Sequence, residues 1–149
     1  MNKIKIVHIL HCVGGVDVYL RLILSNINSD RFTNVIIHGT DDTNKEFQND
    51  KNEKVREYNT AIERNISPIN DFKAIYAILK ILRIEKPDLI HCHSAKGGII
   101  GRFLGRLLRI KVLYTPHAFS YLSTESNFKK NIYIGIERLF ANGNSILLA

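Results

Sequence analysis

Hydrophobic residues follow two alternating patterns along this chain. Short apolar runs, with the composition of buried parallel strands, are separated by longer segments in which apolar residues return every three or four positions. The apolar runs predict strands at 3–10, 34–38, 60–64, 88–91, 111–115 and 145–149. The periodic segments predict helices at 16–28, 70–86, 96–109 and 128–140.

The second predicted helix carries a start signal and a continuous apolar stripe. Asn70 is expected to cap it. Its buried stripe would comprise Phe72, Ile75, Tyr76, Leu79 and Leu82. The segment before it, residues 40–59, is polar and charge-rich, which predicts a mobile loop with room for one surface helix.

Strands that alternate with helices in this way pair in parallel, and the helices cover the sheet. We therefore expect an α/β fold, a Rossmann-like, doubly wound, mostly parallel sheet with helices on both faces, as one domain over residues 1–149. No apolar run approaches the roughly 18 residues of a membrane span, and the first residues lack the features of a secretory signal. Two cysteines do not make a disulfide framework, so a reducing, cytoplasmic setting is expected.

The charge balance favours anionic partners. Lysine and arginine number 21 against 14 acidic residues, a net charge of +7, which suits phosphates, nucleic acid or acidic lipid. Nucleic acid is not expected, because the aromatic residues are not interleaved with the basic ones. Within the helix at 96–109, Arg102, Arg106 and Arg109 share one face. That face would contact an anionic membrane or a diphosphate, or it would be the solvated side of a packing helix.

In a parallel sheet of this kind, ligands bind beyond the carboxyl ends of the strands. Three loops are expected there, at 11–15, 91–98 and 116–119. In the first, Gly14 and Gly15 would let the backbone approach a ligand closely, and the helix that follows would attract a phosphate or sugar oxygen. The spacing of the glycines fits neither a dinucleotide fingerprint nor a P-loop. The alternative is a tight turn without a ligand.

Histidines dominate the other two loops. His91 and His93 point the same way on an extended strand, and Ser94 and Lys96 follow them into a helix. These groups would bind a polyhydroxylated or phosphorylated ligand; otherwise Ser94 caps the helix and His91 is a hydrogen-bonded core residue. His117 would be aimed by the proline before it and would donate or accept a hydrogen bond, unless it is structural.

Two segments also bring potential metal ligands together. They are His8, His11, Cys12, His91, Cys92 and His93. No C-x-x-C or H-E-x-x-H spacing accompanies them, so neither a metal nor another cofactor is expected. The two cysteines are instead expected to be small buried residues.

Taken together, these segments resemble the N-terminal half of family 4 glycosyltransferases, which have the two-domain GT-B architecture. The resemblance rests on KIVHILHCVGGVDVYL, on the stretch from RNISPIND to TPHAF, and on IERLFA before SILLA. The family's forms are a Gly-Gly loop near an acidic residue, a P-D-hydrophobic-hydrophobic-H-x-H-S turn, and T-x-H-G-F. Their order and spacing match over most of the chain. Members that resemble this subtype often build capsular or surface polysaccharide.

The resemblance implies a role for each loop. The segment with Gly14, Gly15 and Asp17 would face the interdomain cleft, and His117 would lie beside the reacting sugar as the catalytic-site histidine. The acceptor side would be lined by His93, Ser94, Lys96 and Gly97. The resemblance also implies retention of anomeric configuration, no metal, and a nucleotide-sugar donor held mainly by a C-terminal domain. The acceptor would be a glycan or a lipid-diphosphate-linked sugar, with peripheral contact at the inner face of the membrane.

Three departures from the family's pattern shape these expectations. Asp17 stands where glutamate is common and Ala118 where glycine is common, and both changes are mild. The C-terminal donor-binding domain is absent from these residues, so we expect the isolated chain to be inactive and its uncovered cleft surface to favour self-association. The alternatives are a non-catalytic sugar- or phosphate-binding module, a subunit of a split transferase, or a generic nucleotide-binding domain that binds free nucleotide tightly.

Overall fold

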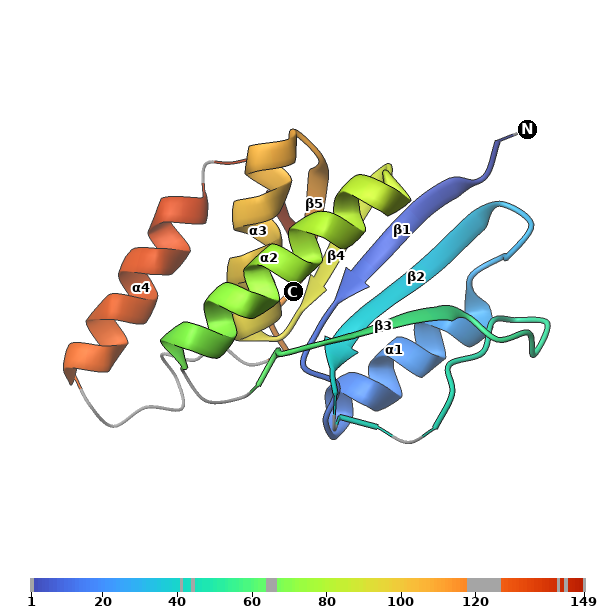
Figure 1. The fold of residues 1–149 in the computed structure, drawn as a ribbon, viewed down its shortest axis with the longest axis horizontal. Coiled ribbons are helices and arrows are strands. Elements are labelled where there is room, and N and C mark those ends of the chain that lie inside the picture. The colour runs from blue at the N-terminus through green and yellow to red at the C-terminus, as the bar shows by residue number, and fades with distance from the viewer. Residues whose placement is uncertain are drawn as a thin grey trace.

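The computed structural model describes residues 2–40, 42–43, 45–63, 67–117, 127–141, 143 and 145–148. Strands and helices alternate along most of the chain (Figure 1). In chain order the elements are β1 (Ile4–Ile9), α1 (Gly15–Asn26), β2 (Phe32–Gly39), β3 (Arg56–Thr60), α2 (Pro68–Glu85), β4 (Leu89–His93), α3 (Ala95–Leu108), β5 (Lys111–Thr115), α4 (Asn127–Ala141) and β6 (Ser145–Leu147).

The strands form one six-stranded sheet in the order β3-β2-β1-β4-β5-β6. All five pairings are parallel. The chain runs outward from β1 to β3, then crosses back and places β4 on the other side of β1. The carboxyl ends of β1 and β4 therefore flank the point where the strand order reverses, which is where sheets of this class bind ligands. The predicted Rossmann-like fold is confirmed.

Helices cover both faces of the sheet. Odd-numbered residues of β1 and β2, such as Val7 and Ile37, join the core formed with α2 and α3. Even-numbered Leu10 and Ile36 face the opposite layer, where they pack with Leu20 and Leu24 of α1. This alternation follows from the two-residue repeat of a strand. The even-numbered side chains of β1 and the odd-numbered ones of β4 thus share the layer of α1.

Glycines let α3 lie unusually close to the sheet. A Cβ atom on Gly97 would come 2.7 Å from the carbonyl oxygen of Ile9, and one on Gly101 would overlap Cys92 Sγ. Gly98 and Gly105 are buried in the same way, against Tyr114 and Val112. Not every apolar side chain of α3 is buried by this packing: Phe103 and Leu107 are exposed.

The third predicted strand was placed too late in the chain. Residues 56–60 form β3, whereas 61–63 have no regular structure in the described part of the chain. Between β2 and β3, the described residues contain no helix; an antiparallel bridge joins Gln48 to Lys54, and Phe47 is fully buried. β3 lies at the edge of the sheet, where a strand needs fewer apolar residues, so its sequence does not stand out.

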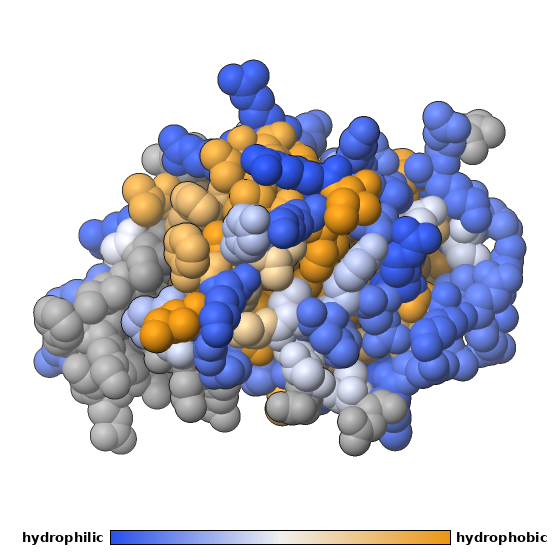
Figure 2. Space-filling view, in the orientation of Figure 1, coloured by the Kyte–Doolittle hydropathy of each residue, from blue (hydrophilic) through white to orange (hydrophobic). Residues whose placement is uncertain are grey.

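The buried stripe predicted for α2 was wrong in part. Ser67, not Asn70, holds the cap position, and Pro68 begins the helix. Phe72 and Tyr76 are 72% and 56% exposed, while the buried side is formed by Ala74, Ile78, Ile81 and Leu82. Figure 2 shows the result: apolar side chains gather on the outer surface over α2 and α3, with charged groups among them.

Candidate functional site

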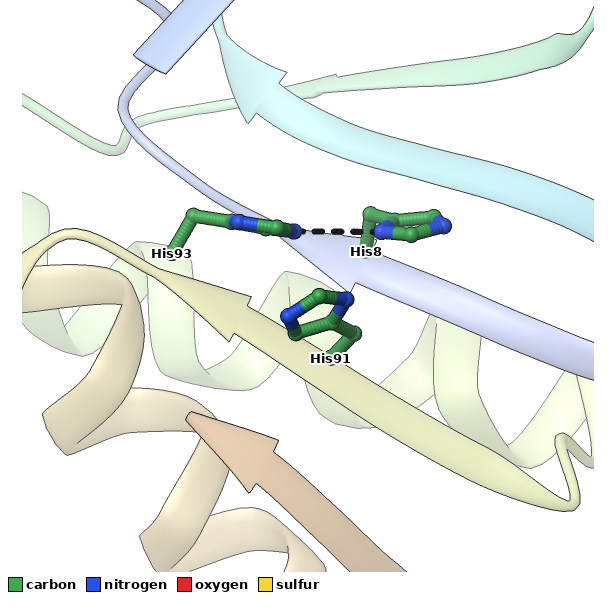
Figure 3. A group of neighbouring side chains, drawn as sticks. All are labelled: His8, His91 and His93. Atoms are coloured by element: carbon green, nitrogen blue, oxygen red, sulfur yellow. Dashed lines mark hydrogen bonds between the residues drawn. The ribbon is translucent and has the colours of Figure 1, made fainter. Parts of the chain in front are cut away.

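The carboxyl ends of β1 and β4 bring three histidines together (Figure 3). His8 of β1 lies directly opposite His91 of β4 in the sheet. His93, two residues further along β4, points to the same side. All three side chains are buried, and they lie in the layer of α1. The sheet thus joins residues that are more than 80 positions apart in the sequence.

Hydrogen bonds fix the orientation of these rings. His8 Nδ1 and His93 Nε2 are 3.1 Å apart, and the other nitrogen of His8 lies 3.1 Å from Oδ1 of Asn34 on β2. His91 Nε2 lies 3.0 Å from the Thr115 hydroxyl at the end of β5. The rings of His91 and His93 are 3.9 Å apart between centroids. His91 is therefore a hydrogen-bonded, buried residue, as one of its two interpretations held.

Burial keeps these histidines neutral. Loss of water lowers the pKa of His8 from 6.5 to about 4, although the hydrogen bond to Asn34 acts in the opposite direction. Burial, with the charges of His8 and His117, lowers the pKa of His91 to about 3. The pKa of His93 falls well below its usual range for the same reasons, burial first. At neutral pH the cluster is a set of uncharged donors and acceptors.

His117 lies at the outer side of this cluster. It follows β5 with a left-handed φ of 59°, its side chain is exposed, and its ring stacks at 5.7 Å on that of His93. Tyr19 of α1 approaches the His117 ring edge-on at 4.7 Å and the His93 ring at 5.9 Å. Partial burial lowers the pKa of His117. Ala118 and Phe119 of this loop lie outside the described residues.

The Gly14–Gly15 segment leaves its backbone open. Gly14 has φ 61° and ψ −128°, a conformation that favours glycine, and α1 begins at Gly15. A Cβ on either residue would meet no atom within 4 Å. Asp17 is held within the protein: both carboxylate oxygens accept hydrogen bonds of 3.0 Å from Arg21 Nε, and one accepts a 3.2 Å bond from the Cys12 thiol.

The start of α3 has an unusual backbone. Ser94 occupies the cap position with φ 65°, and its side chain makes no capping hydrogen bond, so the cap interpretation is wrong. Within the described part of the chain, Ser94 Oγ and His93 Nδ1 are buried atoms without a hydrogen-bond partner. Lys96 donates a 2.6 Å bond to Asp71 of α2. Gly97 faces β1, and close packing there already requires a glycine.

The three arginines predicted to share one helix face do not form one exposed face. Arg102 is only 4% exposed, because its guanidinium lies between the rings of Tyr114 and Phe140, at 4.2 and 5.0 Å. Its Nε donates to the Gly98 carbonyl. Arg106 and Arg109 are exposed. Phe140 of α4 covers the first of the three positions, and the third, Arg109, follows the end of α3 with a left-handed φ of 58°.

Two supporting residues were not predicted. Asn34 is the one polar residue in the segment 34–37, and its position at the start of a buried apolar run was an available signal. Asp42 ties β1 to β2: its carboxylate accepts from the backbone N–H groups of Gly39 and Cys12 and lies 2.8 Å from His11 Nδ1. Nothing in the sequence marks this pairing.

Only part of the predicted metal-ligand set comes together. One nitrogen from each of His8, His91 and His93 lies within 4.8 Å of the others, so among the described residues these three neutral imidazoles are the group that could hold an ion. An ion bound between His8 and His93 would have to replace their hydrogen bond. Cys92 faces the opposite layer with α3, and burial raises the pKa of its thiol to about 12, which disfavours the thiolate that metals bind.

Comparisons with known proteins identify relatives of this chain. Over 75 residues the chain is 41% identical to UDP-Gal:alpha-D-GlcNAc-diphosphoundecaprenol alpha-1,3-galactosyltransferase of Escherichia coli, covering 50% of this chain and 19% of that enzyme. It is 38% identical over 91 residues to an uncharacterized 41.2 kDa protein in the cps region of Klebsiella pneumoniae, covering 58% of this chain and 25% of that protein. The matches thus span at most a quarter of these two relatives.

Solved structures share the fold at low sequence identity. MurG of Acinetobacter baumannii superposes with a TM-score of 0.66 and 12% identity, over 97% of this chain and 40% of that one. The UDP-N-acetylglucosamine 2-epimerase of Rickettsia bellii gives 0.60 and 15%, over 91% and 37%. The model of one protein family, Glycosyltransferase Family 4, matches residues 13–149. The chain belongs to Glycosyltransferase Family 4, and its fold is that of an N-terminal GT-B domain.

Proposed function

We propose that this chain is the acceptor-binding part of a retaining glycosyltransferase that moves a sugar from a nucleotide-sugar to a lipid-diphosphate-linked or glycan acceptor. The observation that carries this proposal is the 41% identity to a galactosyltransferase whose acceptor is GlcNAc-diphosphoundecaprenol. The relative from a cps region supports a role in capsular or surface polysaccharide. The setting would be the cytoplasmic face of the membrane.

The site is chemically suited to a sugar. Its central imidazoles are neutral, and the rings of Tyr19 and His117 provide flat surfaces beside them. In this proposal His117 positions the reacting sugar. The open backbone at Gly14 and Gly15 contacts the acceptor or the donor diphosphate, Asp17 keeps that turn in shape, and the acceptor side is formed by His93, Ser94, Lys96 and Gly97.

A separate C-terminal domain would hold the nucleotide-sugar. The family resemblance places a basic pair and the glutamates of an E-x7-E segment in that domain, and it requires no metal. The isolated chain would therefore bind acceptor but not transfer sugar. The surface that faces the partner domain would also favour self-association of the isolated chain.

The outer surface of α2 and α3 would contact the membrane (Figure 2). Its exposed apolar side chains are Ile69, Phe72, Tyr76, Ile84, Phe103 and Leu107. Exposed basic side chains accompany them, namely Lys73, Lys80, Arg83, Arg106 and Arg109. Apolar groups among cations suit the interface of an anionic bilayer. Among the described helices, none has the length and apolar character needed to cross a bilayer.

The test compares the chain alone with the chain fused to the C-terminal half of the E. coli relative. We expect transfer from UDP-galactose to GlcNAc-diphosphoundecaprenol by the fusion only. In the fusion, His117→Ala should lower the rate about a hundredfold because the reacting sugar is misplaced. His38→Gln is the control and should leave the rate unchanged, since His38 lies on β2, contacts Glu57 and is not one of the proposed site residues.

Calorimetry on the isolated chain gives a second measurement. We expect binding of the lipid-diphosphate acceptor and no tight binding of UDP. Tight UDP binding, or transfer by the isolated chain, would contradict the division of roles. Acceptor binding combined with an inactive fusion would favour a non-catalytic binding module.

A further inference from the structure

The hydrogen bonds from Asn34 to His8 and from His8 to His93 have a fixed direction. The carboxamide oxygen of Asn34 can only accept, so the His8 nitrogen that it contacts, Nε2, must carry the proton. A neutral imidazole has one N–H group, so His8 Nδ1 carries a lone pair. It therefore accepts from Nε2–H of His93. The Nδ1 atom of His93 is then left as a bare acceptor.

The series of hydrogen bonds that links Asn34, His8 and His93 has a fixed direction because both histidine rings are neutral. A protonated ring would donate from both nitrogens, so it could not accept a hydrogen bond from the next ring. His8 is 1% exposed and His93 is fully buried, and burial lowers the pKa of both residues far below neutrality. At physiological pH each ring therefore has a single, determined tautomer.

The last acceptor in this series of hydrogen bonds has no partner in the described part of the structure. His93 Nδ1 is buried and unpaired, and Ser94 Oγ on the next residue is in the same state. A buried polar atom without a partner is unfavourable, because it has lost its hydrogen bonds to water and has not replaced them. Buried polar atoms without a partner are rare in folded proteins, and a bound ligand is one way to supply the missing hydrogen bond. Both lie where β4 passes into α3, at the predicted ligand edge of the sheet.

We propose that Asn34, acting through His8, holds His93 as the Nε2–H tautomer, so that His93 Nδ1 binds a hydroxyl proton of a sugar. This proposal rests on the proposed function and specifies the ligand group at one position of that site. A hydroxyl has a proton to give, whereas a fully ionised phosphate oxygen has none and would be repelled by the lone pair. Asn34 and His8 are positioning residues in this arrangement.

Access to His93 requires a movement of the rings beside it. The Tyr19 and His117 rings lie at 5.9 and 5.7 Å from the His93 ring. Both side chains are exposed on their other sides. To reach His93 Nδ1, a sugar would have to displace the Tyr19 and His117 rings and occupy the space beside the His93 ring. The phosphate-binding part of the site would then lie elsewhere, at the open backbone of Gly14 and Gly15.

The tautomer can be read directly. Long-range proton–nitrogen NMR on the chain labelled with 15N-histidine distinguishes a protonated ring nitrogen from a bare one. We expect Nε2–H on both His8 and His93 in the unmodified chain at pH 7.5. Asn34→Leu should give a mixture of tautomers at His93. Thr115→Val is the matched control: it removes the partner of His91 and should leave His93 unchanged.

The ligand is tested with two probes. N-acetylglucosamine should shift the His93 Nδ1 signal toward the hydrogen-bonded range, and dimethyl phosphate, which carries no proton at pH 7.5, should not. Asn34→Leu should weaken the sugar response about tenfold, the effect of one hydrogen bond. The proposal is overturned if unmodified His93 carries its proton on Nδ1, if folded Asn34→Leu keeps the tautomer, or if dimethyl phosphate alone shifts Nδ1. A failure of Asn34→Leu to fold leaves the measurement on the unmodified chain decisive.

These outcomes are independent of the transfer assay. The tautomers are observed without donor, partner domain or turnover. An inactive fusion with the expected tautomers would contradict the proposed function alone. An active fusion with the opposite tautomer at His93 would contradict this inference alone.

Discussion

At the scale of single residues, the distinctive feature is a group of histidines that are buried without charge. Most histidines near a protein surface gain a proton close to pH 6.5, whereas those of this cluster resist protonation because water has been removed from around them. The same property sets the direction of their hydrogen bonds and ties the stability of the fold to pH.

We predict a loss of stability between pH 6.5 and about 4. The unfolded chain binds protons at its histidines below pH 6.5, but folded His8 does so only near 4, so falling pH favours the unfolded state across this window. For His8 alone the loss is about 3 kcal/mol. Urea unfolding at half-unit pH steps should show the free energy of unfolding falling steadily.

The His8→Gln variant provides the control for this effect. Its free energy of unfolding is lower throughout, but its slope between pH 6.5 and 4.5 should be shallower by the share that His8 contributes. Equal slopes in the two proteins would show that the cluster does not govern acid stability. The measurements stop at pH 4.5 so that protonation of folded Glu85, whose pKa lies at about 2, does not contribute to the slope.

At the scale of elements, one carboxylate joins a helix to two strands. Glu85, near the end of α2, accepts a 3.0 Å bond from Lys5 of β1. Its other oxygen accepts from Arg56 at 2.8 Å and from the Tyr58 hydroxyl at 2.7 Å, both on β3. Burial would raise the pKa of Glu85, but these hydrogen bonds outweigh it and lower the pKa to about 2.

Glu85→Gln should therefore destabilise the fold by about 2 kcal/mol, the scale of hydrogen bonds to a charged group. Chemical unfolding measures the difference. The matched control is Glu46→Gln, since Glu46 pairs with Lys54 on the exposed surface and should cost under about 0.5 kcal/mol. Comparable losses in the two variants would mean that the buried position of Glu85 adds nothing.

The contact between α3 and β1 gives a second prediction at this scale. Gly97→Ala places a methyl group against the Ile9 carbonyl, and main chain cannot move aside cheaply. We expect a loss of about 2 kcal/mol, as for other overpacked sites. Gly135→Ala in α4 meets no atom within 4 Å and should be neutral or stabilising by about 0.5–1 kcal/mol. Thermal unfolding of both variants measures the difference. A larger loss of stability in Gly135→Ala than in Gly97→Ala would contradict the prediction.

At the scale of the whole molecule, the apolar and basic surface over α2 and α3 predicts binding to anionic vesicles. Sedimentation with phosphatidylglycerol vesicles should carry the chain down, and added salt should release it. Replacing Phe72 and Tyr76 by glutamate should weaken binding at least about tenfold, because apolar burial is lost and charge repulsion is added. Leu22→Glu, on exposed α1, is the control. Equal binding of all three proteins would exclude this surface as the contact.

How far the sequence predicted the molecule depends on the range of the interactions involved. β1, β4 and β5 were recognised because a buried parallel strand is a continuous apolar run. β3 was misplaced because an edge strand with Glu57 and Asn59 is not such a run. In α2, two adjacent apolar stripes were possible, and only packing against the sheet selected Ala74 and Ile78 over Phe72 and Tyr76.

The site was predicted in the same uneven way. Topology alone placed the loops of Gly14, His93 and His117 at one edge of the sheet. The partnership of His8 with His93 and Asn34 depends on three strands meeting in a particular register, which local patterns do not encode. Arg102 was misjudged for a related reason, since the helix that covers it comes later in the chain.

The close packing of α3 against the sheet determines which residues of the site can be substituted without loss of the fold. The helix that follows Ser94 is located by its glycines, which pack against main-chain atoms of β1 and against the side chains of Cys92, Val112 and Tyr114. None of these contacts involves Tyr19, Ser94 or Lys96. Residues lining the turn at Ser94 can then be exchanged without shifting the helix. A library that varies Tyr19, Ser94 and Lys96 while keeping the four glycines of α3 should remain folded, and under the proposed function it should yield altered sugar preferences. Under the proposed function, the sheet and α3 would keep their positions while the side chains that select the sugar change.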